Sequence, residues 1–202
     1  MKFAEAVFRN ARLNVKSKSL LIALALTITI FAISAWHGYN LPKQKIIDVI
    51  DSLNKTIPKK PSAAEIWMAN SLTLVMFPMD ILFLKTTPIH VNGMILGVVY
   101  RVLEYMNSTA IFWSGTLPHG VIELPALFLG WAAWTKFIFY IPLLPLINIC
   151  MKMRGRSFNV KSAFINEVKQ LLSTLYICIC LLALAALIEK YVTPLIMSLF
   201  SP

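Results

Sequence analysis

The sequence has little charge and few cysteines for its length. Only 14% of the 202 residues are Asp, Glu, Lys or Arg, whereas soluble domains carry about 25%. Apolar residues make up 58% of the chain, and they form blocks long enough to cross a bilayer, which takes about 20 residues each. These proportions argue against a water-soluble enzyme. They predict a single membrane domain over residues 1–202, without room for a separate soluble catalytic domain.

Motifs for cofactor and metal chemistry are also missing. Cys150, Cys178 and Cys180 lie inside apolar blocks, and their spacing fits neither a disulfide framework nor a metal site. The sequence contains no HExxH, no GxGD and no glycine-rich phosphate loop. We therefore expect no cofactor, no metal and no direct use of ATP.

The basic residues, which give a formal net charge of +10, flank the apolar blocks. Lysine and arginine are enriched in cytoplasmic segments beside membrane spans, where they also contact lipid headgroups. A sequence pI near 9.7 commonly suggests nucleic-acid binding, but this placement favours a role in topology, and we expect no nucleic-acid partner. The two main groups are Lys2, Arg9, Arg12, Lys16 and Lys18 before the first block, and Lys152, Arg154, Arg156, Lys161 and Lys169 before the last.

The first half of the chain is predicted to contain three spans. Residues 1–18 form a basic cytoplasmic juxtamembrane helix, and residues 20–36 form the first span, for which a cleaved signal peptide is the alternative. Residues 38–64 form an extracytoplasmic loop with some helical periodicity. Two further spans are expected over about residues 65–84 and 88–106.

The second half is harder to divide because residues 109–151 exceed one span and contain four prolines. If both basic groups are cytoplasmic, an even number of crossings separates them. This stretch then supplies one crossing plus a broken or re-entrant segment over residues 137–150; two full crossings are the alternative. With a last span over residues 171–188, we expect an all-α polytopic bundle of about five transmembrane helices in the cell membrane. Its N-terminus would be cytoplasmic and its C-terminus extracytoplasmic.

Ionisable residues within lipid are unfavourable unless they have a partner or line a cavity. The topology places Asp80 and Lys136 on the cytoplasmic side. It places five residues on the outer side, namely Arg101, Glu104, His119, Glu123 and Glu189.

His119 and Glu123 are four residues apart, so they share one face of a helix that is expected to begin at Pro118. Gly120 between them would let a neighbouring backbone approach. Three interpretations remain open. The first is a buried polar network in which Arg101 pairs with Glu123 or Glu189. The others are a partner-docking or proton-responsive site, and a metal or hydrolytic centre, although zinc normally takes three protein ligands.

Two further patterns concern packing and modification. Gly93 and Gly97, which follow Asn92, form a small-xxx-small pair that favours close helix packing in lipid. Asn54 and Asn107 each begin an N-x-[S/T] glycosylation pattern, and both fall outside in the five-crossing topology.

The segment from Leu117 to Ala126 resembles the stage II sporulation protein M family, whose central helix carries a Pro-His-Gly-x-x-Glu-Leu-Pro-Ala signature. The matching positions here include Pro118, His119, Gly120, Glu123 and Pro125. Further agreement, which extends the similarity over residues 65–195, is found at Asn70, at Asn92-Gly93 with Gly97, and at Ala186 to Glu189 with Thr193-Pro194.

This resemblance implies a multi-pass protein without established catalytic activity; sporulation members of the family act as scaffolds for a cell-wall-degrading complex. We therefore expect a non-enzymatic scaffold or accessory subunit that contacts membrane lipids and other membrane or extracytoplasmic proteins, with a homo-oligomer as a further option. One alternative is a permease-like subunit that moves a small solute or ion as an oligomer. The other is an intramembrane hydrolase that uses His119 and Glu123.

Overall fold

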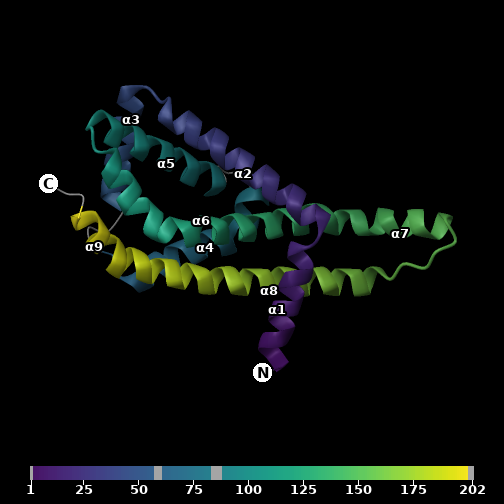
Figure 1. Ribbon diagram of the computed structural model, residues 1–202. Helices are drawn as coiled ribbons and strands as arrows, with labels where there is room; N and C mark the ends of the chain where they lie inside the picture. The colour runs from purple at the N-terminus through teal and green to yellow at the C-terminus, as the bar shows by residue number, and fades with distance from the viewer. Residues whose placement is uncertain (1, 57–60, 83–87, 200–202) are drawn as a thin grey trace.

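The computed structural model describes residues 2–56, 61–82 and 88–199, and these residues form helices and no strand (Figure 1). Three helical stretches are long and apolar enough to cross a membrane: Lys18–Tyr39, Thr109–Met153 and Val160–Ser198. The chain is therefore an all-α membrane protein. Its elements are α1 (Lys2–Val15), α2 (Lys18–Tyr39), α3 (Lys43–Thr56), α4 (Ala63–Leu82), α5 (Pro88–Tyr105), α6 (Thr109–Tyr140), η1 (Ile141–Leu143), α7 (Leu144–Met153), α8 (Val160–Leu187), η2 (Ile188–Val192) and α9 (Thr193–Ser198).

The longest feature is a helical hairpin, in which α6, η1 and α7 run in one direction and α8, η2 and α9 return beside them (Figure 1). The first arm has 45 residues, which at 1.5 Å per residue is about 67 Å long. The hydrocarbon core of a bilayer is only about 30 Å thick. The hairpin therefore extends well beyond the hydrocarbon core.

The expected break over residues 137–150 is limited to the short 3-10 turn η1 between α6 and α7, and the expected helix start at Pro118 is wrong. The helix begins at Thr109 and contains Pro118 and Pro125 within it, an arrangement that transmembrane helices tolerate because neighbouring groups satisfy the freed carbonyls. Pro142 and Pro145 lie in the first turns of η1 and α7. In a first turn the backbone N–H has no acceptor within the helix, so proline, which lacks this N–H, is tolerated there. Residues 137–150 therefore continue the hairpin arm and are not re-entrant.

The second pair of helices, α2 and α5, run parallel in very close contact. A Cβ at Gly93 would lie 2.6 Å from the carbonyl oxygen of Phe31, and a Cβ at Gly97 would overlap the carbonyl oxygen of Ala35. Gly38 of α2 lies equally close to the backbone of Met94. Such contact requires glycine, because any side chain at these positions would separate the two backbones.

The helix α4 lies beside α6 and runs in the same direction. Leu74 packs on Gly130, and the Phe77 ring stacks on the Trp131 ring with centroids 6.3 Å apart. Trp131 and Leu74 are completely buried. They belong to an apolar core between α2, α4, α6 and α8 that also contains Leu182.

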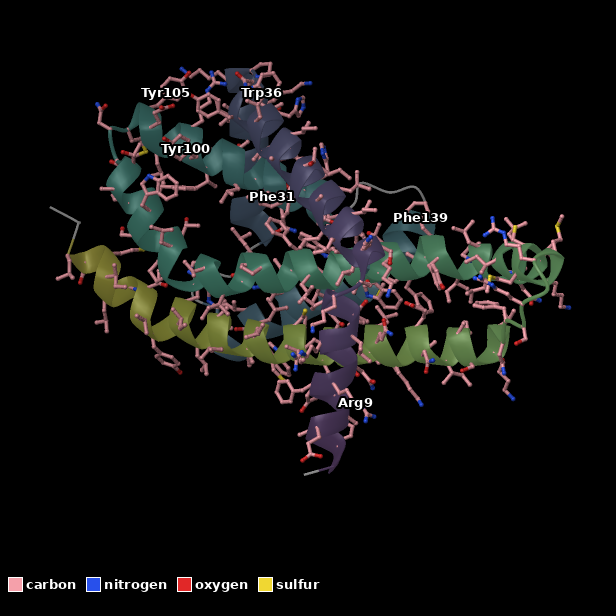
Figure 2. All side chains as sticks on the ribbon, turned by 45° about the vertical axis from the view of Figure 1, so that its right-hand side comes forward. Arg9, Phe31, Trp36, Tyr100, Tyr105 and Phe139 are labelled. Atoms are coloured by element: carbon pink, nitrogen blue, oxygen red, sulfur yellow. The ribbon has the colours of Figure 1, made fainter. Side chains whose placement is uncertain are left out.

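Aromatic residues gather at the end of the bundle where α2 and α5 end. Figure 2 shows Trp36, Tyr100 and Tyr105 toward this end, whereas Arg9 of α1 lies at the opposite side. The Tyr100 ring meets the Phe112 ring edge to face, with centroids 5.0 Å apart. Aromatic belts of this kind occur at the membrane–water interface.

The helix α1 crosses α8 (Figure 1). It is held there by a buried polar cluster around Lys136, which we call the Lys136 cluster. Lys136 is only 6% exposed, and its Nζ lies 2.8 Å from Glu167 Oε2. It also donates to Asn14 Oδ1 at 2.9 Å and Gln170 Oε1 at 3.1 Å. Asn14 in turn donates to Thr174 Oγ1 at 2.8 Å. These bonds join α1, α6 and α8.

We predict that Lys136→Met destabilises the protein by about 3–5 kcal/mol, because it leaves the Glu167 carboxylate, which is only 15% exposed, without its partner. The double variant Lys136→Met with Glu167→Met removes both charges and is expected to recover most of that loss. Thermal unfolding of the detergent-solubilised protein measures both. A double variant as unstable as the sum of the two single variants would contradict the account.

Candidate functional site: a histidine and two glutamates between the helices

Three ionisable side chains meet at the aromatic end of the hairpin, and we call them the His–Glu cluster: His119, Glu123 and Glu189. One ligand atom of each lies within 4.8 Å of one ligand atom of the other two. His119 Nε2 lies 3.9 Å from Glu123 Oε2, and both side chains are mostly buried, with exposures of 16% and 18%. The structure thus brings together three of the residues that the sequence pattern singled out.

The three side chains come from two elements, α6 and η2. His119 and Glu123 lie one turn apart on α6, so they project from the same face. Glu189 lies in η2, a five-residue π-helical turn in which the backbone N–H of Thr193 bonds to the carbonyl of Ile188. Pro194 has no N–H to offer to the preceding turn, which favours this wider turn. Single π-helical turns are frequently found at functional sites.

Two polar residues contact the His119 and Glu123 atoms that face away from the rest of the cluster. Asn70 Nδ2 of α4 donates to Glu123 Oε1 at 3.0 Å. His119 Nδ1 lies 3.3 Å from Thr193 Oγ1, and Thr193 is only 5% exposed. The other atoms of the pair, His119 Nε2 and Glu123 Oε2, are therefore fixed so that they face each other. Neither Asn70 nor Thr193 was placed in the cluster from the sequence, although polarity within an apolar block marks Asn70.

A small cavity of about 180 Å³ lies against the cluster, and His119, Glu123 and Asn92 are among its lining residues. Asn92 Nδ2 itself donates to the Pro88 carbonyl at 2.8 Å. Gly120 also lines the cavity. In the described part of the chain a Cβ at Gly120 would meet only Thr116 of its own helix, at 3.5 Å. The expected approach of a neighbouring backbone at Gly120 is therefore wrong; the glycine leaves space on the cavity side.

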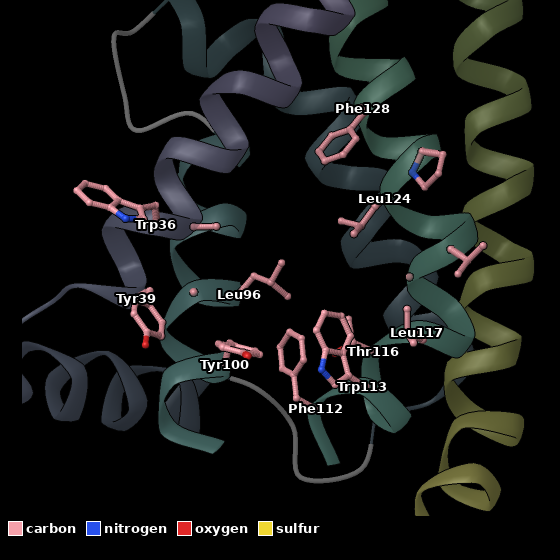
Figure 3. A pocket seen from close by; sticks show the side chains of 15 residues that line it. Trp36, Tyr39, Leu96, Tyr100, Phe112, Trp113, Thr116, Leu117, Leu124 and Phe128 are labelled. Carbon is pink, nitrogen blue, oxygen red and sulfur yellow. The ribbon is translucent and has the colours of Figure 1, made fainter. Parts of the chain in front are cut away.

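A larger apolar cavity of about 710 Å³ lies beside the small one, between α2, α5 and α6 (Figure 3). The two cavities share lining residues on α5 and α6, among them Leu96, Phe112 and Gly120. Figure 3 shows Tyr100, Phe112 and Trp113 close together along one side of the larger cavity. The polar cluster thus borders a space whose walls are almost entirely apolar.

Arg101 does not belong to the cluster, so its expected pairing with Glu123 or Glu189 is wrong. Its guanidinium donates from Nη1 to the carbonyl oxygens of Tyr39 and Leu41, and from Nη2 to the Tyr105 hydroxyl at 2.8 Å. Because α5 runs parallel to α2, Arg101 lies one turn beyond Gly97 on the side that faces the end of α2. There it satisfies carbonyls at a helix C-terminus, where a cation is favoured.

The remaining charged residues considered from the sequence lie elsewhere. Glu104 accepts a hydrogen bond from the Tyr39 hydroxyl at 2.8 Å, at the same helix end as Arg101. The side chains of Asp80 and Asn54 lie outside the described residues. Asn107 is exposed in the turn between α5 and α6, with a positive φ of 53°.

The cluster has an unusual charge balance for a site between membrane helices. Among the described residues, the ion pairs are His119 with Glu123 and Lys136 with Glu167. Lys190 is next to Glu189 in the chain, but its Nζ donates to the Pro61 carbonyl at 2.8 Å. Two carboxylates therefore share one imidazole without a lysine or arginine partner in this part of the structure. Such a group needs protons or a bound cation, and one imidazole with two carboxylates is a donor set that binds divalent metals.

We predict that Asn70→Leu destabilises the protein by about 1–3 kcal/mol, because Glu123 Oε1 loses its donor inside the bundle. Ser71→Ala is the matched control, since Ser71 Oγ is buried and has no hydrogen-bond partner among the described residues. Thermal unfolding in detergent is expected to separate the two variants. Equal stability of Asn70→Leu and Ser71→Ala would contradict a structural role for the Asn70–Glu123 bond.

Comparisons with known proteins identify the family. The sequence model for stage II sporulation protein M matches residues 19–194, which run from the first turn of α2 through η2 and include all three residues of the His–Glu cluster. No curated protein and no solved structure gives a significant match. The chain belongs to the stage II sporulation protein M family.

Proposed function

We propose that this protein is a non-enzymatic scaffold or accessory subunit of a membrane complex. The observation that carries the proposal is its membership of the stage II sporulation protein M family over residues 19–194, since sporulation members of that family hold other proteins at a membrane. The described helices also leave no separate soluble domain in which an enzymatic centre would lie.

The proposal includes five crossings, with the N-terminus in the cytoplasm and the C-terminus outside. Helix directions support this count. The glycine contacts make α2 and α5 parallel, and the contacts of Leu74 and Phe77 make α4 and α6 parallel. The bond between Lys136 and Glu167 fits an antiparallel α6 and α8. In the proposed topology α2, α5 and α8 run outward, and α4 and α6 run inward.

Two exposed regions are suited to bind partner proteins in this topology. On the outside, α3 buries Ile46 against Leu41 and Val98 and exposes a charged face that includes Lys45 and Asp48. On the inside, the hairpin carries five basic residues around its turn, namely Lys152, Arg154, Arg156, Lys161 and Lys169. The His–Glu cluster is largely enclosed by helices, so we place the docking surfaces on α3 and the hairpin turn and not on the cluster.

Cysteine labelling tests the topology. In a chain without its three native cysteines, Arg154→Cys is expected to resist a membrane-impermeant maleimide in intact cells and to react after permeabilisation. Lys45→Cys on α3 is the matched control, which is expected to react before permeabilisation. Labelling of Arg154→Cys from outside would reverse the orientation of the hairpin.

Site-directed crosslinking in native membranes tests the scaffold role. A photoreactive residue at Asp48 is expected to give a discrete heteromeric product that disappears when Lys45→Glu is added, because the charged face of α3 is altered. The same residue at Ile22, which is 71% exposed on the apolar surface of α2, serves as the lipid-facing control. A protein that yields no crosslinked partner from α3 or from the hairpin turn would contradict the scaffold proposal.

A further inference from the structure

The His–Glu cluster contains two carboxylates and one imidazole, so a bound cation would balance its charge. Glu123 and Glu189 approach each other beside His119, and no lysine or arginine side chain pairs with either carboxylate in the described part of the chain. Repulsion between two carboxylates is strong where water is scarce. In the Lys136 cluster, at the other end of the same helices, the charge of one glutamate is balanced by one lysine at 2.8 Å.

The arrangement of donor atoms favours a metal over protons alone. Metal-binding histidines and carboxylates are normally held by hydrogen bonds through the atom that does not face the metal. Here His119 Nδ1 faces Thr193 and Glu123 Oε1 accepts from Asn70. The atoms left over, His119 Nε2 and Glu123 Oε2, converge with a carboxylate oxygen of Glu189.

We propose that the His–Glu cluster binds one divalent transition-metal cation through His119 Nε2, Glu123 and Glu189, with the fourth coordination position toward the 180 Å³ cavity. Three protein ligands and one open position is the arrangement of many zinc sites. The sequence-based expectation of no metal differs because the sequence does not show how close Glu189 lies to His119 and Glu123.

The distances are compatible with such a site after small side-chain movements. Zinc lies about 2.0–2.2 Å from nitrogen and oxygen ligands, which in a tetrahedral site places ligand atoms about 3.3–3.6 Å apart. The donor atoms here are within 4.8 Å of one another, and His119 Nε2 lies 3.9 Å from Glu123 Oε2. Imidazole and carboxylate without thiolate suit zinc, manganese or iron(II) better than soft cations such as copper(I).

A bound metal would join η2 to α6, and through Asn70 also to α4. It would thereby fix the end of α8 against the motif that begins at Pro118. The proposal goes beyond the scaffold role and does not depend on it, because metal binding is measured on the isolated chain and partner capture is measured in membranes.

The test uses the full-length chain, purified in detergent through a tag that contains no histidine and stripped with a chelator. Titration with Zn²⁺ against a colorimetric chelator is expected to show one tight site per chain. His119→Gln, Glu123→Gln and Glu189→Gln are each expected to weaken binding at least about 100-fold, since each removes a direct ligand. Thr193→Val and Asn70→Leu are expected to weaken it about 10- to 100-fold, because they release the orientation of a ligand.

Two control variants remove similar side chains elsewhere. His37→Gln removes an exposed imidazole, and Glu104→Gln removes a carboxylate that bonds to Tyr39; both are expected to bind Zn²⁺ as the original chain does. A second measurement covers variants that fold poorly: Zn²⁺ is expected to raise the Tm of the original chain and of both controls. Absence of a tight site in the original chain, or equal binding by Glu189→Gln and Glu104→Gln, would overturn the proposal.

Discussion

Charged groups between membrane helices must be neutralised inside the protein, and the arrangement of this bundle follows from where that neutralisation occurs. Lys136 is surrounded by Asn14, Glu167 and Gln170, and these contacts determine where α1 crosses α8. About 20 Å away along α6, estimated from the helical rise, the His–Glu cluster brings α4, α6 and η2 together. The apolar core around Trp131 fills the space between the two clusters.

The two clusters differ in how their charge is balanced. This difference indicates a structural role for the Lys136 cluster and a ligand-binding role for the His–Glu cluster. The Lys136 cluster contains its own counter-ion and needs nothing from outside, so its role is to hold three helices together. The His–Glu cluster has two carboxylates, one imidazole and an adjacent cavity. In the described part of the chain no lysine or arginine balances its two carboxylates, which makes it the candidate site for a ligand.

Much of the helical fold could be predicted from the sequence, because long apolar blocks specify membrane helices. Alternating directions also place Glu189 at the depth of His119 and Glu123. Depth does not specify which side of a helix faces which neighbour, however. Arg101 lies at a similar depth but points to the end of α2, where the carbonyls of Tyr39 and Leu41 accept its hydrogen bonds.

The prolines show a second limit of sequence interpretation. Proline within an apolar stretch was expected to break the helix, but its effect depends on whether its position needs a backbone N–H. Pro142 and Pro145 lie in first turns, where none is needed, so the hairpin arm continues to Met153. Pro194 likewise lies in the first turn of a helix, α9, and it directly follows the wide turn that orients Glu189.

The end of the second hairpin arm packs on α6, and a disulfide crosslink tests this packing most directly. A Cβ at Gly115 would lie 3.3 Å from Met197 Sδ. In a chain without its native cysteines, the pair Gly115→Cys and Met197→Cys is predicted to form a disulfide within one chain upon mild oxidation in native membranes. No crosslink, or a crosslink only between two chains, would contradict the packing of α9 on α6 and with it the gathering of His119, Glu123 and Glu189.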